Sequence, residues 1–210
     1  AHDLVLQAMT VHDGPFSWEG KYYNYKNINI WPRPWQQPHP PVWITGTSPG
    51  SAYVVGKRGY TFATFLTGFR TGMIFDQYRK GWSEMGRSEP VTPDKLAYLA
   101  LGAVASSERE AHRKAAEVLR YVTTTGIVAE PFRNPPGYLS IEDNVRMLRA
   151  IGKTRERMVP TRTGGSVNIA GTPSVHDLVE AGLMFAGTPD QVYDQIVAFE
   201  GVAWSGYISV

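Results

Sequence analysis

Short apolar runs alternate with amphipathic stretches along most of the chain. The runs are rich in β-branched, aromatic and other large apolar residues, and they span 42–46, 60–64, 95–104 and 206–210. Such short runs are typical of strands that are buried on both faces. Between them, apolar residues recur at helical spacing over 52–58, 71–85 and 107–121. Because strands and helices alternate, the pattern predicts the α/β class with a parallel sheet.

The two ends of the chain carry other patterns. Residues 2–10 have the spacing of an amphipathic helix, and the aromatic-rich stretch 16–31 predicts a hairpin that turns near Lys26 and Asn27. Late in the chain, Thr172-Pro173 and Thr188-Pro189 each predict a helix start, because a hydroxyl can cap the helix and proline suits its first position. Gly182 and Gly201 are the predicted ends of these two helices.

The turn after the run at 42–46 is the strongest candidate for chemistry. Gly46-Thr-Ser-Pro-Gly-Ser51 separates a predicted strand from a predicted helix, and it contains no acidic residue. In such a turn the backbone N–H groups and the positive end of the helix dipole converge, and hydroxyl groups add further donors. We therefore expect an anion such as a phosphate at this turn. An ordinary turn with a serine cap is the alternative that the same residues allow.

Composition narrows the classes of partner. The 210 residues carry a net charge of only +2, which argues against nucleic acid or an anionic membrane as a partner. A basic cluster at Arg109, His112, Arg113 and Lys114 is interrupted by glutamates, so we expect a solvated helix face there. No apolar run approaches 18 residues, so the sequence predicts no membrane span.

The numbers and spacing of cysteine and histidine residues exclude further kinds of site. The chain has no cysteine, which excludes disulfides, thiolate metal sites and a cysteine nucleophile, and which is compatible with a cytoplasmic protein. The five histidines lack the spacing of metal ligands, so we expect no metal site.

Several motifs occur in an order that resembles one family. They are the aromatic Gly20-Lys-Tyr-Tyr23, the proline-rich stretch 31–41, Val42-Trp-Ile-Thr-Gly46, Ser48-Pro-Gly-Ser-Ala52 and Phe185-Ala-Gly-Thr-Pro-Asp-Gln-Val192. Together they resemble the bacterial luciferase-like flavin monooxygenases, a TIM-barrel family that uses reduced flavin and oxygen. The resemblance spans nearly all of the 210 residues.

The resemblance implies one domain over residues 1–210, built as part of a TIM barrel. The four apolar runs would be barrel strands five to eight, and 121–171 would be the family's variable insertion after strand seven. Strands one to four would precede Ala1, so the chain would be the C-terminal half of an enzyme and inactive alone. The open edges of such a half would also favour aggregation.

The resemblance also assigns roles to particular residues. In the family the segment after strand five binds the flavin phosphate, which places Thr47, Ser48, Gly50 and Ser51 in the cofactor site. Phe62 and Thr64, at the end of strand six, would be neighbours of the flavin ring. Packing in the core of the barrel is the alternative for these two, and the local sequence favours it. The catalytic residues would lie before Ala1.

The implied function is FMN-dependent oxygenation of a small organic substrate by reduced flavin and O2. A separate flavin reductase would be a partner, and the full-length enzyme would be a homo-oligomer. One alternative is an F420-dependent oxidoreductase of the same superfamily, which would transfer hydride without oxygen. Another is a non-catalytic half-barrel that binds flavin or is purely structural.

Overall fold

The structure, a computed structural model, describes residues 1–125, 141–142, 145, 158–169, 173–203 and 207–209. It divides into two compact units, residues 1–42 and residues 43–210. The single domain over 1–210 that the sequence suggested stays a prediction.

The first unit contains one helix and one hairpin. Helix α1 (His2–Thr10) is followed by strand β1 (Phe16–Glu19), which pairs antiparallel with strand β2 (Asn24–Ile28). The predicted helix over 2–10 and the predicted hairpin are therefore confirmed.

The hairpin turns at a different place from the one predicted. The Gly20 N–H donates to the Tyr23 carbonyl oxygen at 3.0 Å and to Asn24 Oδ1 at 3.1 Å, so the chain reverses over residues 20–23. The predicted turn at Lys26 and Asn27 is wrong. Asn27 does adopt a left-handed backbone, with φ of 57°, but it lies within β2 where the pairing register shifts. Its conformation marks a bulge, which asparagine suits as well as it suits a turn.

A four-stranded parallel sheet forms the centre of the second unit. Its strands are β3 (Trp43–Thr45), β4 (Thr61–Phe65), β5 (Leu96–Leu99) and β10 (Tyr207–Ser209), in the order β10-β5-β4-β3. All three pairings are parallel, so the α/β class and the parallel sheet are confirmed. The sheet ends at β3 and β10 without further pairing among the described residues, so these form no closed barrel.

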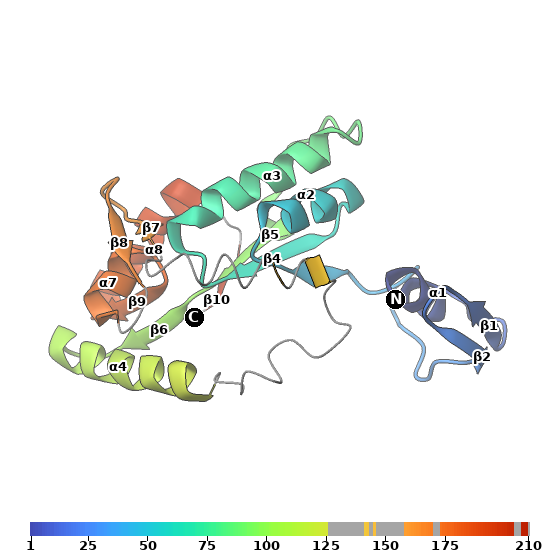
Figure 1. The fold of residues 1–210 in the computed structure, drawn as a ribbon, viewed down its shortest axis with the longest axis horizontal. Coiled ribbons are helices and arrows are strands. Elements are labelled where there is room, and N and C mark those ends of the chain that lie inside the picture. Colours follow the sequence, from blue (N-terminus) through green and yellow to red (C-terminus); the bar gives the residue numbers. More distant parts are fainter. Residues whose placement is uncertain (126–140, 143–144, 146–157, 170–172, 204–206, 210) are drawn as a thin grey trace. The chain divides into compact units, whose positions relative to one another are not determined.

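Two helices cover one face of this sheet (Figure 1). They are α2 (Pro49–Arg58) and α3 (Thr71–Ser83); the short helices η1 (Gly68–Arg70) and η2 (Pro93–Lys95) precede α3 and β5. The core beneath the helices includes Phe62, Phe75 and Tyr78, each with no exposed surface. The rings of Phe62 and Phe75 meet edge to face, with centroids 6.4 Å apart.

Two glycines let α2 and α3 approach each other closely. A Cβ added at Gly56 would lie 2.2 Å from the carbonyl oxygen of Tyr78, and one added at Gly81 would lie 2.2 Å from that of Tyr53. Neither position has room for a side chain. The two helices therefore contact backbone to backbone.

The apolar run 95–104 is not one strand. After β5 ends at Leu99, the chain passes through the buried Ala100 and continues as β6 (Leu101–Val104) in a second parallel sheet with β9 (Met184–Gly187). The predicted single strand is wrong, because the apolar pattern runs through both halves and does not show that they pair with different strands. Strand β9 was not predicted.

Helices and a hairpin surround the second sheet. They are α4 (Glu108–Thr125), α7 (Val175–Glu180), α8 (Pro189–Ala203) and the antiparallel pair β7 (Met158–Pro160) and β8 (Ser166–Asn168). The pair β7–β8 lies within the predicted insertion 121–171, of which 126–140, 143–144, 146–157 and 170–171 lie outside the described residues. The insertion itself stays a prediction.

The late helices differ in part from their predicted bounds. Helix α8 begins after Thr188 as predicted, and the Gln191 N–H donates to Thr188 Oγ1 at 3.4 Å. Helix α7 begins at Val175 rather than after Thr172, because Ser174 and Asp177 form a reciprocal capping box. Gly201 does not end α8, which continues to Ala203.

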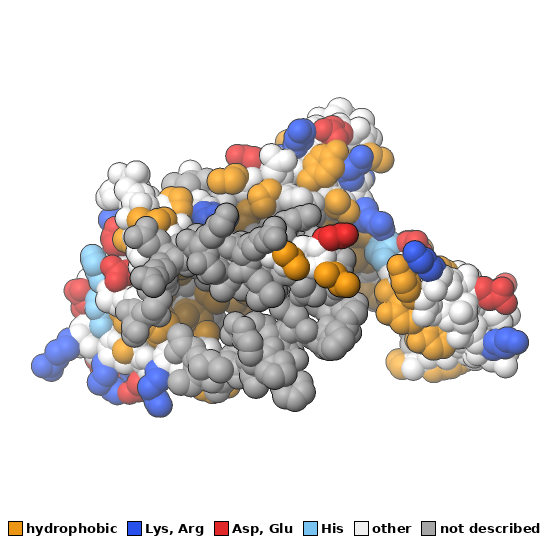
Figure 2. Space-filling view, in the orientation of Figure 1, with side chains coloured by type: hydrophobic (Ala, Val, Ile, Leu, Met, Phe, Trp, Pro, Cys, Tyr) orange, Lys and Arg blue, Asp and Glu red, His pale blue; other side chains and the backbone are white. Residues whose placement is uncertain are grey.

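The basic cluster on α4 is a solvated, charge-paired face, as predicted. Arg113 pairs with Glu117 at 2.6 Å and Lys114 pairs with Glu110 at 3.2 Å. Figure 2 shows blue and red side chains interspersed over this helix, at the lower left. Such mixed charge gives no continuous basic surface.

Candidate functional site

The predicted phosphate turn forms the N-terminal end of α2. Ser48 caps the helix, since its Oγ accepts a hydrogen bond from the Ser51 N–H at 3.1 Å. Pro49 is the first helical residue, three positions earlier than the sequence pattern indicated. The ordinary serine cap that the sequence allowed is therefore present. A ligand could bind only through hydrogen-bond donors of the turn that the cap does not use.

The turn retains several donors. The hydroxyls of Ser48 and Ser51 lie 2.9 Å apart, so one of their two protons joins them and the other is left for a ligand. A Cβ added at Gly50 would meet nothing within 4 Å, so a ligand can approach the backbone there. The first turn has no acidic residue, and the first N–H groups of a helix have no partner within it. These properties suit an anion.

A cavity of about 280 Å³ lies at the carboxyl ends of β3 and β4. It is lined by Thr47, Phe65, Leu66, Thr67, Arg70 and Val159. We call it the β3–β4 cavity. The carboxyl ends of parallel strands are where α/β proteins bind their ligands. Of the predicted site residues, Thr47 lines this cavity, and Ser48, Gly50 and Ser51 follow it on the exposed first turn of α2.

Arg70 brings a positive charge to the β3–β4 cavity. Its side chain is exposed, and it takes part in none of the ion pairs between residues that the structure describes. A guanidinium presents a fork of donors that matches a phosphate. Sequence reasoning missed Arg70, because its place beside Thr47 depends on where β4 ends and where α3 begins.

Leu66 stands out in the cavity wall by its backbone. It has φ of 49°, a left-handed conformation that bulky residues rarely adopt. Its N–H donates to the Leu99 carbonyl oxygen at 3.1 Å, which ties the end of β4 to the end of β5. The strained residue thus lies where the chain leaves the sheet and enters the cavity wall.

The two predicted neighbours of the flavin ring lie in the core. Phe62 is 0% exposed and packs under α2 and α3, and Thr64 is 1% exposed. Because alternate residues of a strand point to opposite faces, Thr64 shares the helix-covered face with Phe62, whereas Ala63 and Phe65 lie on the other face. Phe62 therefore packs in the core, which was its alternative, and the placing of Phe62 and Thr64 beside a flavin ring stays a prediction.

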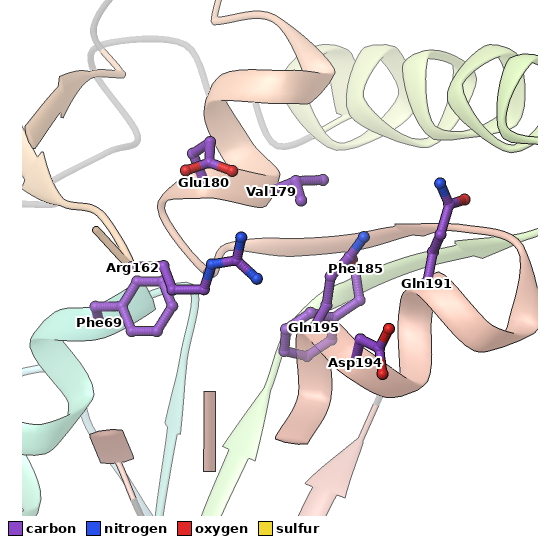
Figure 3. Close-up of a pocket in the computed structure, with 9 residues that line it drawn as sticks. Phe69, Arg162, Val179, Glu180, Phe185, Gln191, Asp194 and Gln195 are labelled. Carbon is purple, nitrogen blue, oxygen red and sulfur yellow. The ribbon is translucent and has the colours of Figure 1, made fainter. Parts of the chain in front are cut away.

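A second cavity, of about 210 Å³, lies between α7, α8 and η1. Figure 3 shows Arg162 reaching over Phe69 toward Phe185, with Glu180 and Asp194 also at the cavity. The side-chain amide of Gln195 makes two hydrogen bonds to the backbone of Ala186. Its Oε1 accepts from the Ala186 N–H at 2.9 Å, and its Nε2 donates to the Ala186 carbonyl oxygen at 3.0 Å. None of the predicted site residues lines this cavity.

Two further properties of the described residues bear on the kind of site. Among the described residues, no three histidine, aspartate or glutamate side chains are grouped so that they could hold a metal ion. None of the helices that the structure describes is long and apolar enough to cross a bilayer.

Comparison with known proteins identifies relatives of this fold. The oxygenating constituent of 3,6-diketocamphane monooxygenase from Pseudomonas putida, a type II Baeyer–Villiger monooxygenase solved in complex with FMN, matches with a TM-score of 0.63 and 17% identity, covering 100% of this chain and 55% of that one. An F420-dependent secondary alcohol dehydrogenase, in complex with an F420–acetone adduct, matches with a TM-score of 0.58 and 15% identity, covering 98% of this chain and 52% of that one. The chain thus spans about half the length of these solved structures.

Comparison of sequences adds two matches. An uncharacterized protein of Sinorhizobium fredii, y4wF, is 32% identical over 88 residues, which are 42% of this chain and 24% of that protein. The sequence model of the luciferase-like monooxygenase family matches residues 3–205, nearly the whole chain. The chain therefore belongs to the luciferase-like monooxygenase family.

Proposed function

We propose that this chain holds the cofactor phosphate of a flavin-dependent oxidoreductase, and that the cofactor is FMN. The observation that carries the proposal is the joint placement of Thr47 and Arg70 at the β3–β4 cavity, directly beside the first turn of α2. Hydroxyl, backbone N–H and guanidinium donors then serve one anion, with no carboxylate in that turn. Reduced FMN, when bound, would supply the redox chemistry with O2 on a small organic substrate.

The arrangement of the sheet supports the proposal of a partial barrel. The strands β3, β4, β5 and β10 lie side by side in chain order, and each pair is parallel, as in a TIM barrel. We propose that they correspond to barrel strands five to eight. Because the chain spans about half the length of its solved relatives, the remaining strands and the catalytic residues would come from sequence before Ala1. The described half would then hold the cofactor without being active alone.

F420 is the second candidate cofactor. One relative is an F420-dependent alcohol dehydrogenase, and the side chain of F420 also contains a phosphate, so the same donors would serve it. With FMN we further propose a separate flavin reductase as partner, a homo-oligomeric full-length enzyme and a cytoplasmic location.

A binding experiment with matched variants tests the phosphate site. FMN and riboflavin, which differ only in the phosphate, are titrated against the chain and followed by flavin fluorescence. Ser51→Ala removes one hydroxyl but keeps the cap, because Ser48 Oγ accepts from the backbone N–H of residue 51. Arg70→Gln removes the charge, and Arg79→Gln, in the middle of α3, is its control.

The expected result is weaker binding of FMN alone. A hydrogen bond to a charged group contributes about 1.5–3 kcal/mol, so Arg70→Gln should weaken FMN by about 10- to 100-fold and leave riboflavin unchanged. If wild-type chain binds FMN and riboflavin equally, the phosphate site is refuted. Replacing FMN by F420 in the same titration decides between the two cofactors.

A further inference from the structure

Three threonine hydroxyls form a chain whose middle member, Thr67, lines the β3–β4 cavity. Thr64 Oγ1 lies 3.3 Å from Thr67 Oγ1, and Thr67 Oγ1 lies 2.7 Å from Thr71 Oγ1. Thr71 Oγ1 donates to the Gly68 carbonyl oxygen at 2.6 Å. Thr64 and Thr71 are buried, and the half-buried Thr67 lines the cavity.

The direction of hydrogen bonding along this chain is fixed from its buried end. The Gly68 carbonyl oxygen can only accept, so the single proton of Thr71 is used there. Thr71 Oγ1 must then accept the proton of Thr67 at 2.7 Å. Because Thr67 already donates its only hydroxyl proton to Thr71, Thr64 must be the donor in the contact between Thr64 and Thr67. Thr67 is left with one oxygen lone pair and no proton, so toward the cavity it is an acceptor only.

The segment that carries Thr67 is held rigidly. Tyr98 Oη accepts from the Gly68 N–H at 3.0 Å and donates to the Gly182 carbonyl oxygen at 2.7 Å. The Phe69 N–H donates to the Ala181 carbonyl oxygen at 3.1 Å. These bonds come from two other parts of the unit and are centred on Gly68. The backbone next to Thr67 is therefore held in place, and the direction of the hydroxyl chain is set by its hydrogen-bond partners.

We infer that Thr67 is a specificity-determining residue, which selects a ligand that presents a hydroxyl or N–H donor beside its phosphate. The inference rests on the proposed function. It adds that the ligand must carry a hydrogen-bond donor next to its phosphate. Arg70 and the turn at Ser48–Ser51 offer donors to the phosphate, whereas Thr67 offers an acceptor in the same cavity. A phosphorylated polyol, such as the ribityl phosphate of FMN, matches this pairing. A phosphate on a plain alkyl chain does not.

The test compares two ligands and two variants. One ligand is FMN, and the other is a flavin with the same ring and phosphate but a pentyl chain that lacks hydroxyls. Thr67→Val keeps the shape of the side chain and removes the acceptor, whereas Thr67→Ser keeps the acceptor. Dissociation constants are measured for both ligands with each variant, and the melting temperature of each variant reports its folding.

We expect a loss of affinity for only one combination of ligand and variant, which is FMN with Thr67→Val. A neutral hydrogen bond contributes about 0.5–1.5 kcal/mol, so Thr67→Val should weaken FMN about 3- to 10-fold and leave the pentyl analogue unchanged. Thr67→Ser should bind FMN as the wild-type chain does. Equal weakening of both ligands, or unchanged FMN binding in Thr67→Val, overturns the inference while the phosphate site stands. If the wild-type chain binds neither ligand, the proposed function fails and the inference fails with it.

Discussion

The contact at Gly68 gives a prediction that separates backbone conformation from close packing. Gly68 has φ of 55°, and a Cβ at this position would lie 2.0 Å from the carbonyl oxygen of Ala181. Gly86 has φ of 72°, and a Cβ there would meet nothing within 4 Å. The two glycines share the left-handed backbone and differ in the space around it, so Gly86→Ala is a matched control for Gly68→Ala.

The two substitutions should differ several-fold in their effect on the free energy of unfolding. A left-handed alanine costs about 1 kcal/mol relative to glycine, and Gly86→Ala should cost no more than this. Gly68→Ala adds the displacement of the Ala181 carbonyl, which breaks its hydrogen bond from the Phe69 N–H and leaves buried groups unpaired. Each of these two groups costs about 1–3 kcal/mol, so with the backbone cost the total is about 3–7 kcal/mol.

Thermal unfolding followed by circular dichroism measures both effects. For a unit of this size, 1 kcal/mol corresponds to a shift of about 2–4 °C in the melting temperature. We expect Gly86→Ala to lower the melting temperature by about 2–4 °C and Gly68→Ala by about 6–28 °C. Equal shifts would refute the reasoning, because they would show that the chain around Ala181 yields to an added methyl group.

Three other predictions follow from the same contacts. Phe62→Ala should lower the free energy of unfolding by about 3–5 kcal/mol in urea titrations, as expected for a fully buried ring; a loss below about 1 kcal/mol would contradict its place in the core. Ser48→Ala should cost about 1 kcal/mol through loss of the cap of α2, whereas Ser51→Ala should cost little, and equal losses would show that Ser48 is not the cap. Burial raises the pKa of Tyr78 to about 12, above the value near 10 of an unfolded tyrosine, so the stability that this buried phenol contributes is complete below pH 10 and is lost as the pH rises from 10 to 12. Urea midpoints of Tyr78→Phe should therefore fall less steeply over that interval than those of the wild-type chain, and parallel curves would contradict the assignment.

Local patterns were enough to predict most of the elements of the central sheet. The strands at β3 and β4 and the helices α2 and α3 were found because their apolar spacing and their end signals lie within a few residues of each other. The turn at 46–51 was found for the same reason, since the cap, the proline and the glycine are all local.

Features that depend on partners far along the chain were not predicted. The division of the run 95–104 at Ala100 reflects pairing of β6 with β9, more than 80 residues later. Arg70 joins the site only because the ends of β3 and β4 lie side by side. Phe62 and Thr64 were assigned to the flavin ring because they lie near the end of their strand. Both side chains point to the same face of the sheet, and the sequence pattern does not show that the helices cover this face.

The close contact of α2 and α3 has a consequence for any attempt to redesign cofactor preference. Helix α2 begins at the serine turn and α3 begins directly after Arg70, so the two halves of the proposed anion site are the starting points of two helices. The spacing of those helices is set further along by Gly56 and Gly81, where neither backbone tolerates a Cβ. A substitution at either glycine would move the serine turn relative to Arg70 without touching the ligand. Libraries that vary only the cavity wall would therefore leave unchanged the spacing between the two halves of the proposed anion site.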